Sequence, residues 1–185
     1  MTQVEQVLAF WFEEIKPAQW WRKNLAFDAE VRRRFGYLHG IAENGDLTHW
    51  RSNAEGRLAE VLILDQFSRN LYRNQARAYA SDRIAQEQAE ASIKLGLDLE
   101  LAPSKRAFLY MPFMHSESAA HQHNSVKLFA TIEATGNLRS AQRHRAVIEK
   151  FGRFPHRNDA LKRPSTTEEE MFLRQSERVL APLWY

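Results

Sequence analysis

The stretch that decides the fold is residues 52–67, which read SNAEGRLAEVLILDQF. Ser52 and Glu55 have the spacing of a helix capping box, so they predict the start of a helix. Over residues 58–67, apolar side chains then cover nearly every face of that helix. A β-strand in the middle of this stretch is the alternative, but the capped start and the leucine content favour a helix. A helix that is apolar all round belongs in the centre of a protein.

Helix signals recur along the rest of the chain. Apolar residues repeat three and four positions apart, and Gly or Pro follows most of these patterns as a stop signal. The predicted helices start at Thr2, Asp28, Ser52, Ser81, Pro103, Ser118, Asn137, and either Ser165 or Thr167. We therefore expect an all-α fold of about eight helices packed antiparallel.

The composition agrees with this expectation. The 185 residues fit one domain spanning 1–185, and 44% hydrophobic with 26% charged residues is typical of a soluble globular chain. Seven Gly and six Pro are too few for the turns of a many-stranded β fold. The absence of Cys excludes disulfides, thiolate metal sites and a cysteine nucleophile. No 34-residue period is readable, so any relation to tetratricopeptide repeats is one of shape.

The sequence also bears on location. The N-terminus has no basic stretch followed by an apolar run and a small-residue cleavage site. The longest apolar run is far shorter than the ~20 residues that a membrane span needs. We expect a soluble, cytoplasmic protein without membrane contact, whose oligomeric state the sequence does not set.

A first polar cluster lies at the end of the central helix. Asp65, Gln66, Arg69 and Asn70 follow directly on its most apolar part. A carboxylate beside such residues has to be paired, and Arg69 stands one helical turn away. Either Asp65 and Arg69 pin the turn as an ion pair, or the four side chains line a pocket.

A second cluster lies where one predicted helix ends and the next begins. His115 and Glu117 stand there, and Glu117 suits the positive end of the following helix dipole. His115 has no such structural explanation, which makes it a candidate general base. His121 and His123 lie two apart on a helix, hence on different faces, and are poor joint metal ligands.

A third cluster, preceded by His144, reads FGRFPHRN over residues 151–158. Gly and Pro stiffen this loop, so Arg153, His156 and Arg157 are expected to be presented together. Because a guanidinium binds carboxylate or phosphate through two bonds, the loop is a candidate anion site. The structural alternative is that these arginines pair with Asp65, Glu117 or the acidic run at 168–170.

The positive charge of the chain is local. Residues 139–163 carry eight Lys or Arg against two acids, a net of +6, whereas the rest of the chain has a net of −3. This segment lacks the fold motifs and aromatic pattern of RNA-binding modules, so nucleic acid is disfavoured as a partner. A Gly-rich phosphate loop, a nucleophile elbow, an H-E-x-x-H helix and an EF-hand are absent too, and we expect neither metal nor cofactor.

Four stretches of the chain resemble one family, the bacterial domain of unknown function 924. They are VLAFWF at 7–12, LDQF at 64–67, YMP at 110–112 and FGRFPHRN at 151–158. The resemblance implies an all-α domain similar to the tetratricopeptide-like helical superfamily, and it implies no activity. The family pattern differs at Ser68, where Pro is usual, and at His123 and Asn124, which weakens any role for His123.

Three functions remain open. The first is a binding module for an anionic small molecule or acidic peptide, with a site drawn from Asp65, Gln66, Arg69, Asn70, His115, Arg153, His156 and Arg157. The second is a hydrolase or transferase that pairs His115 or His156 with Asp65 or Glu117. In the third, the clusters are interior staples and the protein is an interaction scaffold.

Overall fold

The computed structural model describes residues 1–132 and 135–179, and these contain helices and no β-strand. The all-α prediction is confirmed. The α-helices are α1 (Gln3–Ala9), α2 (Leu25–Glu43), α3 (Ala54–Val61), α4 (Ser68–Leu71), α5 (Asp82–Lys94), α6 (Pro103–Met114), α7 (Ala119–Ala130), α8 (Thr135–Phe151) and α9 (Thr167–Val179). Two segments are π-helical, η1 (Phe10–Glu14) and η4 (Leu62–Phe67). The 3-10 helices are η2 (Pro17–Gln19), η3 (Thr48–Ser52), η5 (Ala76–Tyr79), η6 (Leu97–Glu100) and η7 (Pro155–Arg157).

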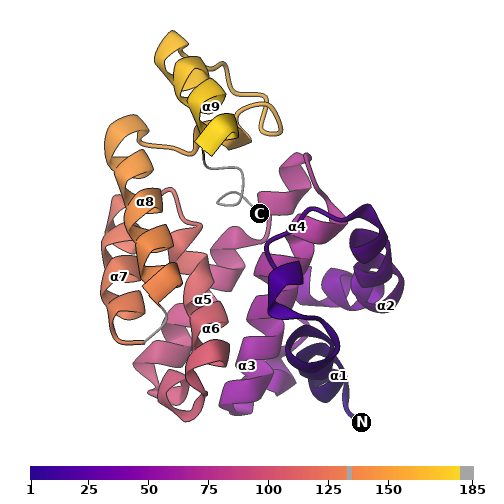
Figure 1. Cartoon of the computed structure of the whole chain (residues 1–185). Coiled ribbons are helices and arrows are strands. Elements are labelled where there is room, and N and C mark those ends of the chain that lie inside the picture. Colours follow the sequence, from indigo (N-terminus) through magenta and orange to yellow (C-terminus); the bar gives the residue numbers. More distant parts are fainter. Residues whose placement is uncertain (133–134, 180–185) are drawn as a thin grey trace.

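The helices pack on two sides of a central segment that consists of α3, η4 and α4 and is called the central rod below. Figure 1 shows α7 and α8 side by side along one edge, with α9 beyond the end of α8, and α1 and α2 on the opposite side. Helix α3 packs against α1, α5 and α6, so it lies between the two sides. The polar clusters of the sequence therefore belong to elements that converge on this rod.

The rod consists of α3, η4 and α4 in direct succession, and it is the predicted central helix. Leu58, Leu62, Ile63 and Leu64 are all fully buried, as is Phe67. None of the described helices is both long and apolar enough to cross a membrane. The apolar surface of the rod is instead covered by neighbouring helices.

The cap of this rod lies one residue later than predicted. Asn53, not Ser52, is the N-cap of α3, because its side-chain oxygen accepts a hydrogen bond from the backbone N–H of Gly56 at 2.9 Å. Ser52 is the last residue of η3. A Cβ at Gly56 would lie 2.0 Å from the carbonyl oxygen of Trp50, so only glycine lets η3 pack so closely on α3.

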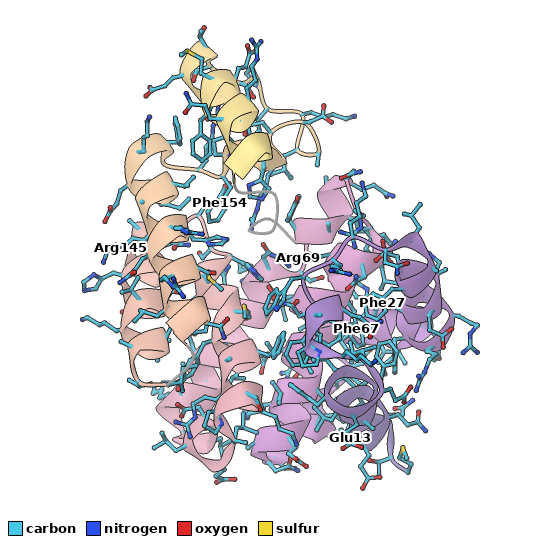
Figure 2. The ribbon with its side chains drawn as sticks, viewed as in Figure 1. Glu13, Phe27, Phe67, Arg69, Arg145 and Phe154 are labelled. Atoms are coloured by element: carbon cyan, nitrogen blue, oxygen red, sulfur yellow. The ribbon has the colours of Figure 1, made fainter. Side chains whose placement is uncertain are left out.

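The buried apolar side chains of the helices form two cores of unequal size. The large one contains Trp11, whose ring lies 5.5 Å from that of Phe67 and 5.6 Å from that of Phe108. The small one consists of Val147, Ile148 and Phe154, with Phe151 and Phe172 packed against it. Figure 2 shows Phe27 and Phe67 on the side of α2 and Phe154 on the side of α8, in keeping with two separate cores.

The predicted start of α2 is wrong. Asn24 is the N-cap, and its side-chain oxygen accepts from the N–H groups of Ala26 at 2.9 Å and Phe27 at 3.2 Å. Asp28, which we expected to cap the helix, lies within the first turn, and its carboxylate binds Arg73 at 2.8 Å. That partner is 45 residues away, so no local pattern indicates it.

The starts of the last two helices also differ from expectation. Asn137 lies inside α8, which begins at Thr135. Neither Ser165 nor Thr167 caps α9: the capping box pairs Thr166 with Glu169, at 3.2 and 2.7 Å. By contrast, the capping box of Thr2 and Glu5 and the first-turn position of Pro103 are confirmed. Gly152, at φ 69°, ends α8 as predicted.

Candidate functional site

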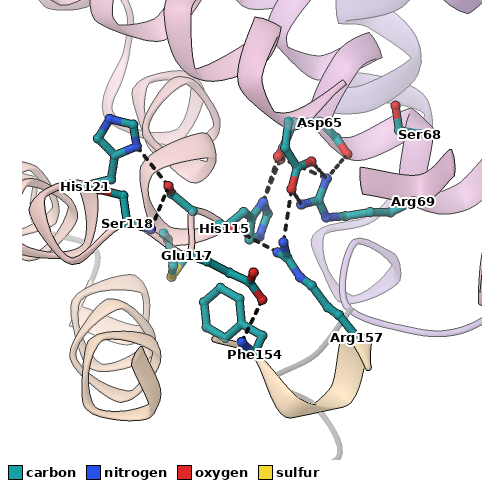
Figure 3. Close-up of polar contacts among 12 residues, drawn as sticks. Asp65, Ser68, Arg69, His115, Glu117, Ser118, His121, Phe154 and Arg157 are labelled. Carbon is teal, nitrogen blue, oxygen red and sulfur yellow. Dashed lines mark hydrogen bonds and ion pairs between the residues drawn. The ribbon is translucent and has the colours of Figure 1, made fainter. Parts of the chain in front are cut away.

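Four polar side chains from four segments meet beside the central rod (Figure 3). Asp65 comes from η4, Arg69 from α4, His115 from the residue that follows α6, and Arg157 from η7. The turn that carries Asp65 is π-helical, a local widening of a helix that is frequent at functional sites. We refer to Asp65, Arg69, His115 and Arg157, together with Asp82, as the central cluster.

The imidazole of His115 is held by the carboxylate of Asp65. Its Nδ1 lies 2.8 Å from Oδ1 and 2.9 Å from Oδ2 of Asp65. Gln66 donates to Oδ2 at 2.7 Å, and Arg69 lies 3.1 Å from Oδ1. These contacts fix the carboxylate from three sides, so the orientation of the imidazole is fixed as well.

The two arginines of the cluster share a second carboxylate, that of Asp82 at the start of α5. Arg69 donates to both of its oxygens, at 3.0 and 3.1 Å, and Arg157 donates to one at 3.2 Å. Arg157 also donates to the carbonyl oxygen of His115 at 2.7 Å. The sequence indicated Asp82 only as a helix start, because its partners stand 13 and 75 residues away.

The protonation states follow from burial and charge. Burial alone would raise the pKa of Asp65, but the charge of Arg69 and the contact with His115 outweigh it and hold that pKa below its usual range. Burial lowers the pKa of His115, and Arg69 adds to this, so the pKa stays below the usual value despite Asp65. At neutral pH, Asp65 is ionised and His115 is neutral. A proton on Nδ1 then faces the carboxylate, which leaves Nε2 as an acceptor.

Arg69 and Arg157 differ in how well their charges are compensated. For Arg69, Asp65 and Asp82 overcome the effect of burial and raise the pKa. For Arg157, burial dominates over the attraction of Asp82, and the pKa is lowered. Arg157 has 6% of its surface exposed, and its Nε makes no hydrogen bond within the part of the chain that the structure describes. The guanidinium lies 4.5 Å from the ring centre of Tyr79 and 4.7 Å from that of Phe154.

Two of the predicted site residues, Arg153 and Asn70, bind partners away from the central cluster. Arg153 points elsewhere and binds Glu169 at 2.6 and 2.8 Å, as the structural alternative predicted. Asn70 donates to Asp28 at 2.8 Å on the side of α2. The loop therefore does not present Arg153 and Arg157 as one fork.

Glu117 has a different role from the one expected. Its carboxylate accepts from the backbone N–H of Phe154 at 2.7 Å and from Arg163 at 2.8 and 2.9 Å. It thereby ties the 151–158 loop to the start of α7. Burial would raise the pKa of Glu117, but the bonds from Arg163 and from the N–H of Phe154, together with the charge of Arg157, lower it.

Two further histidines line the loop side of the cluster. The ring of His144 lies 6.4 Å from that of His115, and burial lowers the pKa of His144 to about 3. His156 is half-buried beside Phe154, and burial followed by the charge of Arg157 lowers its pKa well below the usual value. Among the described residues, no group of His, Asp and Glu is arranged to hold a metal ion.

The basic segment is largely neutralised by ion pairs. These join Arg145 to Glu149, Lys150 to Glu168, Arg153 to Glu169, Arg157 to Asp82, and Arg163 to Glu117. The net charge of +6 over residues 139–163 is therefore not a continuous free surface.

The geometry defines an all-α protein with a buried Asp-His-Arg cluster, and similarity gives its family. Residues 7–177 match bacterial protein of unknown function (DUF924), and the chain belongs to this family. The solved structure of ATU0120, a protein of unknown function from Agrobacterium tumefaciens, is similar at 37% identity and a TM-score of 0.88. The similarity covers 93% of this chain and 97% of that chain. No curated protein matches the chain. The relation to the tetratricopeptide-like superfamily stays a prediction.

Proposed function

We propose that the protein binds a small anionic ligand, a carboxylate or a phosphate, at Arg157. The observation that carries this proposal is the Nε atom of Arg157, which is buried and has no hydrogen-bond partner in residues 1–132 and 135–179. A buried donor without a partner costs free energy, about 1–3 kcal/mol and more for a charged group. A ligand oxygen at this atom removes that cost.

The charges of the cluster support an anion rather than a neutral ligand. Asp82 is already shared between Arg69 and Arg157, and Asp65 is engaged by Arg69 and His115. The two carboxylates match the two guanidiniums in number, but Arg157 contacts only one oxygen of Asp82, whose other contacts are with Arg69, in a place where burial strengthens electrostatic interactions. An anion beside Nε gains a charge-assisted hydrogen bond there.

The depth of the site limits the size of the ligand. Because Nε is buried, it suits a small molecule or one acidic side chain of a peptide, and not a broad protein surface. Location in the cytoplasm, where small carboxylates and phosphates abound, stays a prediction from the sequence.

Thermal unfolding with added anions tests the proposal. The probes are phosphate, sulfate, acetate, succinate and a penta-glutamate peptide, each at the same ionic strength, with chloride as reference. A ligand that binds only the folded state stabilises it by about 2.7 kcal/mol at 100 times its Kd. We expect at least one carboxylate or phosphate to raise the melting temperature of the wild-type chain.

Three variants locate the effect. We expect Arg157→Gln to weaken binding by about 10- to 100-fold, since a hydrogen bond to a charged group is worth about 1.5–3 kcal/mol. Arg157→Lys keeps the positive charge and is expected to retain part of the binding. It therefore still tests the proposal if Arg157→Gln folds poorly. Arg153→Gln, in the same loop but paired with Glu169, is the matched control and leaves binding unchanged.

If none of the probes shifts the melting temperature, the anion site is refuted and an interaction scaffold becomes the better explanation. If only the peptide does, the ligand is an acidic side chain of a partner protein. A shift that Arg153→Gln abolishes and Arg157→Gln keeps also contradicts the proposal.

A further inference from the structure

His115 is placed as a catalytic base would be. Its Nδ1 contacts both oxygens of Asp65, and its backbone carbonyl is held by Arg157 at 2.7 Å. The imidazole is therefore fixed at its ring by Asp65 and at its main chain by Arg157, the residue of the proposed anion site. A fixed imidazole next to a bound ligand is the arrangement that general-base catalysis requires.

The other ring nitrogen of His115, Nε2, is the second feature of this residue. No described residue donates a hydrogen bond to Nε2, and the side chain keeps 11% of its surface exposed. The carboxylate at Nδ1 places the ring proton there, so Nε2 carries the lone pair. A base oriented through its other nitrogen by a carboxylate is the relation that Asp and His have in hydrolytic triads.

No hydroxyl side chain of the described residues bonds to Nε2 of His115. Ser116 is bound by His121 through its side-chain oxygen, and Ser68 donates to the carbonyl of Leu64. Among the described residues no hydroxyl can therefore supply a proton to Nε2, and water or the ligand is the source in our proposal. Water is the simpler source, and it makes the reaction a hydrolysis.

We propose that His115 is the general base in the hydrolysis of an ester that carries a carboxylate or phosphate group, with Asp65 as its positioning residue. This inference rests on the proposed anion site, since Arg157 holds the anionic group of the substrate. Nε2 takes a proton from water, and the water oxygen bonds to the acyl carbon. The C–O bond to the leaving alcohol then breaks, the imidazolium returns the proton to that alcohol, and an acid and an alcohol are released.

Mono-4-nitrophenyl succinate is a suitable probe, because it joins a free carboxylate to an activated ester. 4-Nitrophenyl butyrate has a chain of the same length without the carboxylate and serves as the matched neutral ester. We expect the chain to hydrolyse the succinate ester faster than the butyrate ester. A general base contributes about 10²- to 10⁴-fold, so His115→Gln is expected to slow hydrolysis of the succinate ester by a factor in this range. His123→Asn, at an exposed histidine on α7, is the control and leaves the rate unchanged.

The pH dependence of the hydrolysis rate distinguishes a positioning role of Asp65 from a role in the stability of the fold alone. The rate for the wild-type chain is expected to be constant above the pKa of His115, which lies below 6.5, and to fall in acid. Asp65→Asn removes the group that raises this pKa, so the fall moves to lower pH while the plateau drops. A merely structural Asp65 lowers the amount of folded protein and leaves the midpoint where it is.

Nitrogen NMR of the ring gives a measurement that needs no substrate. In the wild-type chain at pH 7.5, we expect the proton of His115 on Nδ1 and none on Nε2. A proton on Nε2 overturns the proposal.

The two proposals fail in different ways. If succinate binds but His115→Gln hydrolyses the ester as fast as the wild-type chain, or neither hydrolyses it, catalysis by His115 is refuted and the anion site stands. If succinate does not bind, and Arg157→Gln leaves the preference for the charged ester unchanged, the anion site is refuted.

Discussion

Two regions of the molecule are held together by different forces. The central rod and its neighbours, α1 to α7, enclose a large apolar core that contains Trp11, Phe67 and Phe108. Among the described residues, the region from the end of α8 to α9 has a core of three buried apolar residues with Phe151 and Phe172 packed against it, and ion pairs add to its contacts. Apolar burial involves no titrating group and is not screened by ions, whereas ion pairs respond to pH and to ionic strength.

The central cluster lies where these regions meet. Asp65 and Arg69 are set in the rod, and Arg157 from the ion-paired loop binds Asp82, which Arg69 also binds. The proposed general base, His115, is therefore held by Asp65 of the apolar rod. Arg157, the proposed anion-binding residue, depends on an ion pair with Asp82, which is sensitive to charge. Three changes test this division, from the core outwards.

The largest effect is expected in the rod itself. Leu64→Ala removes a fully buried side chain and leaves a cavity, so the free energy of unfolding should fall by about 2–5 kcal/mol. Urea unfolding followed by circular dichroism measures it. Leu99→Ala, at a leucine with 68% of its surface exposed, is the matched control and changes stability little. Equal losses in the two variants contradict an apolar core centred on the rod.

Acid should destabilise the fold through its buried histidines. The folded-state pKa values of His115, His144 and His156 lie below the usual 6.5, and that of His39 in α2 is also lowered, mainly by burial. Above pH 6.5, both states leave these rings neutral and stability is unaffected. As the pH falls below 6.5, the unfolded state takes up protons that the folded state does not. Stability therefore decreases, by at most about 1.4 kcal/mol per pH unit for each such histidine.

Thermal unfolding between pH 7.5 and 5.0 measures this slope. His144→Leu should flatten it, because His144 has the pKa of about 3 and so stays neutral through the whole range. His123→Asn, which alters an exposed ring, should leave it unchanged. A melting temperature that does not fall between pH 6.5 and 5.0 refutes the neutral, buried state of these histidines.

The contrast between the two regions also explains which structural features could be predicted from the sequence. The central helix and the capping box of Thr2 and Glu5 follow from local patterns, and both are confirmed. The pairing of Asp65 with Arg69, one helical turn apart, follows from the same kind of local rule. Short-range periodicity therefore predicts the central helix, although the local cap predictions at Ser52, Asp28 and Asn137 are wrong.

The composition of the site depends on long-range contacts instead. The sequence left four pairings open, His115 or His156 with Asp65 or Glu117, and the structure selects His115 with Asp65 at 2.8 Å. These residues stand 50 positions apart, so only the packing of α6 on the rod brings them together. The role of Asp82 has the same cause, since both of its arginines come from other segments. Arg153 and Arg157, four residues apart, were expected together and face different carboxylates.

The smallest of the three effects is expected at Glu117, which ties the loop to α7. Glu117→Gln keeps the shape of the side chain but removes its charge, so the bonds from Phe154 and Arg163 weaken. We expect a loss of about 1 kcal/mol, as for a partly exposed ion pair with a backbone hydrogen bond. Hydrogen exchange should rise in residues 152–163 and stay unchanged in α3. Glu87→Gln, in the exposed pair with Arg83, provides the control with no measurable change. Faster exchange in α3 as well would show that the loop and the rod unfold as one unit, and the division between the two regions would be wrong.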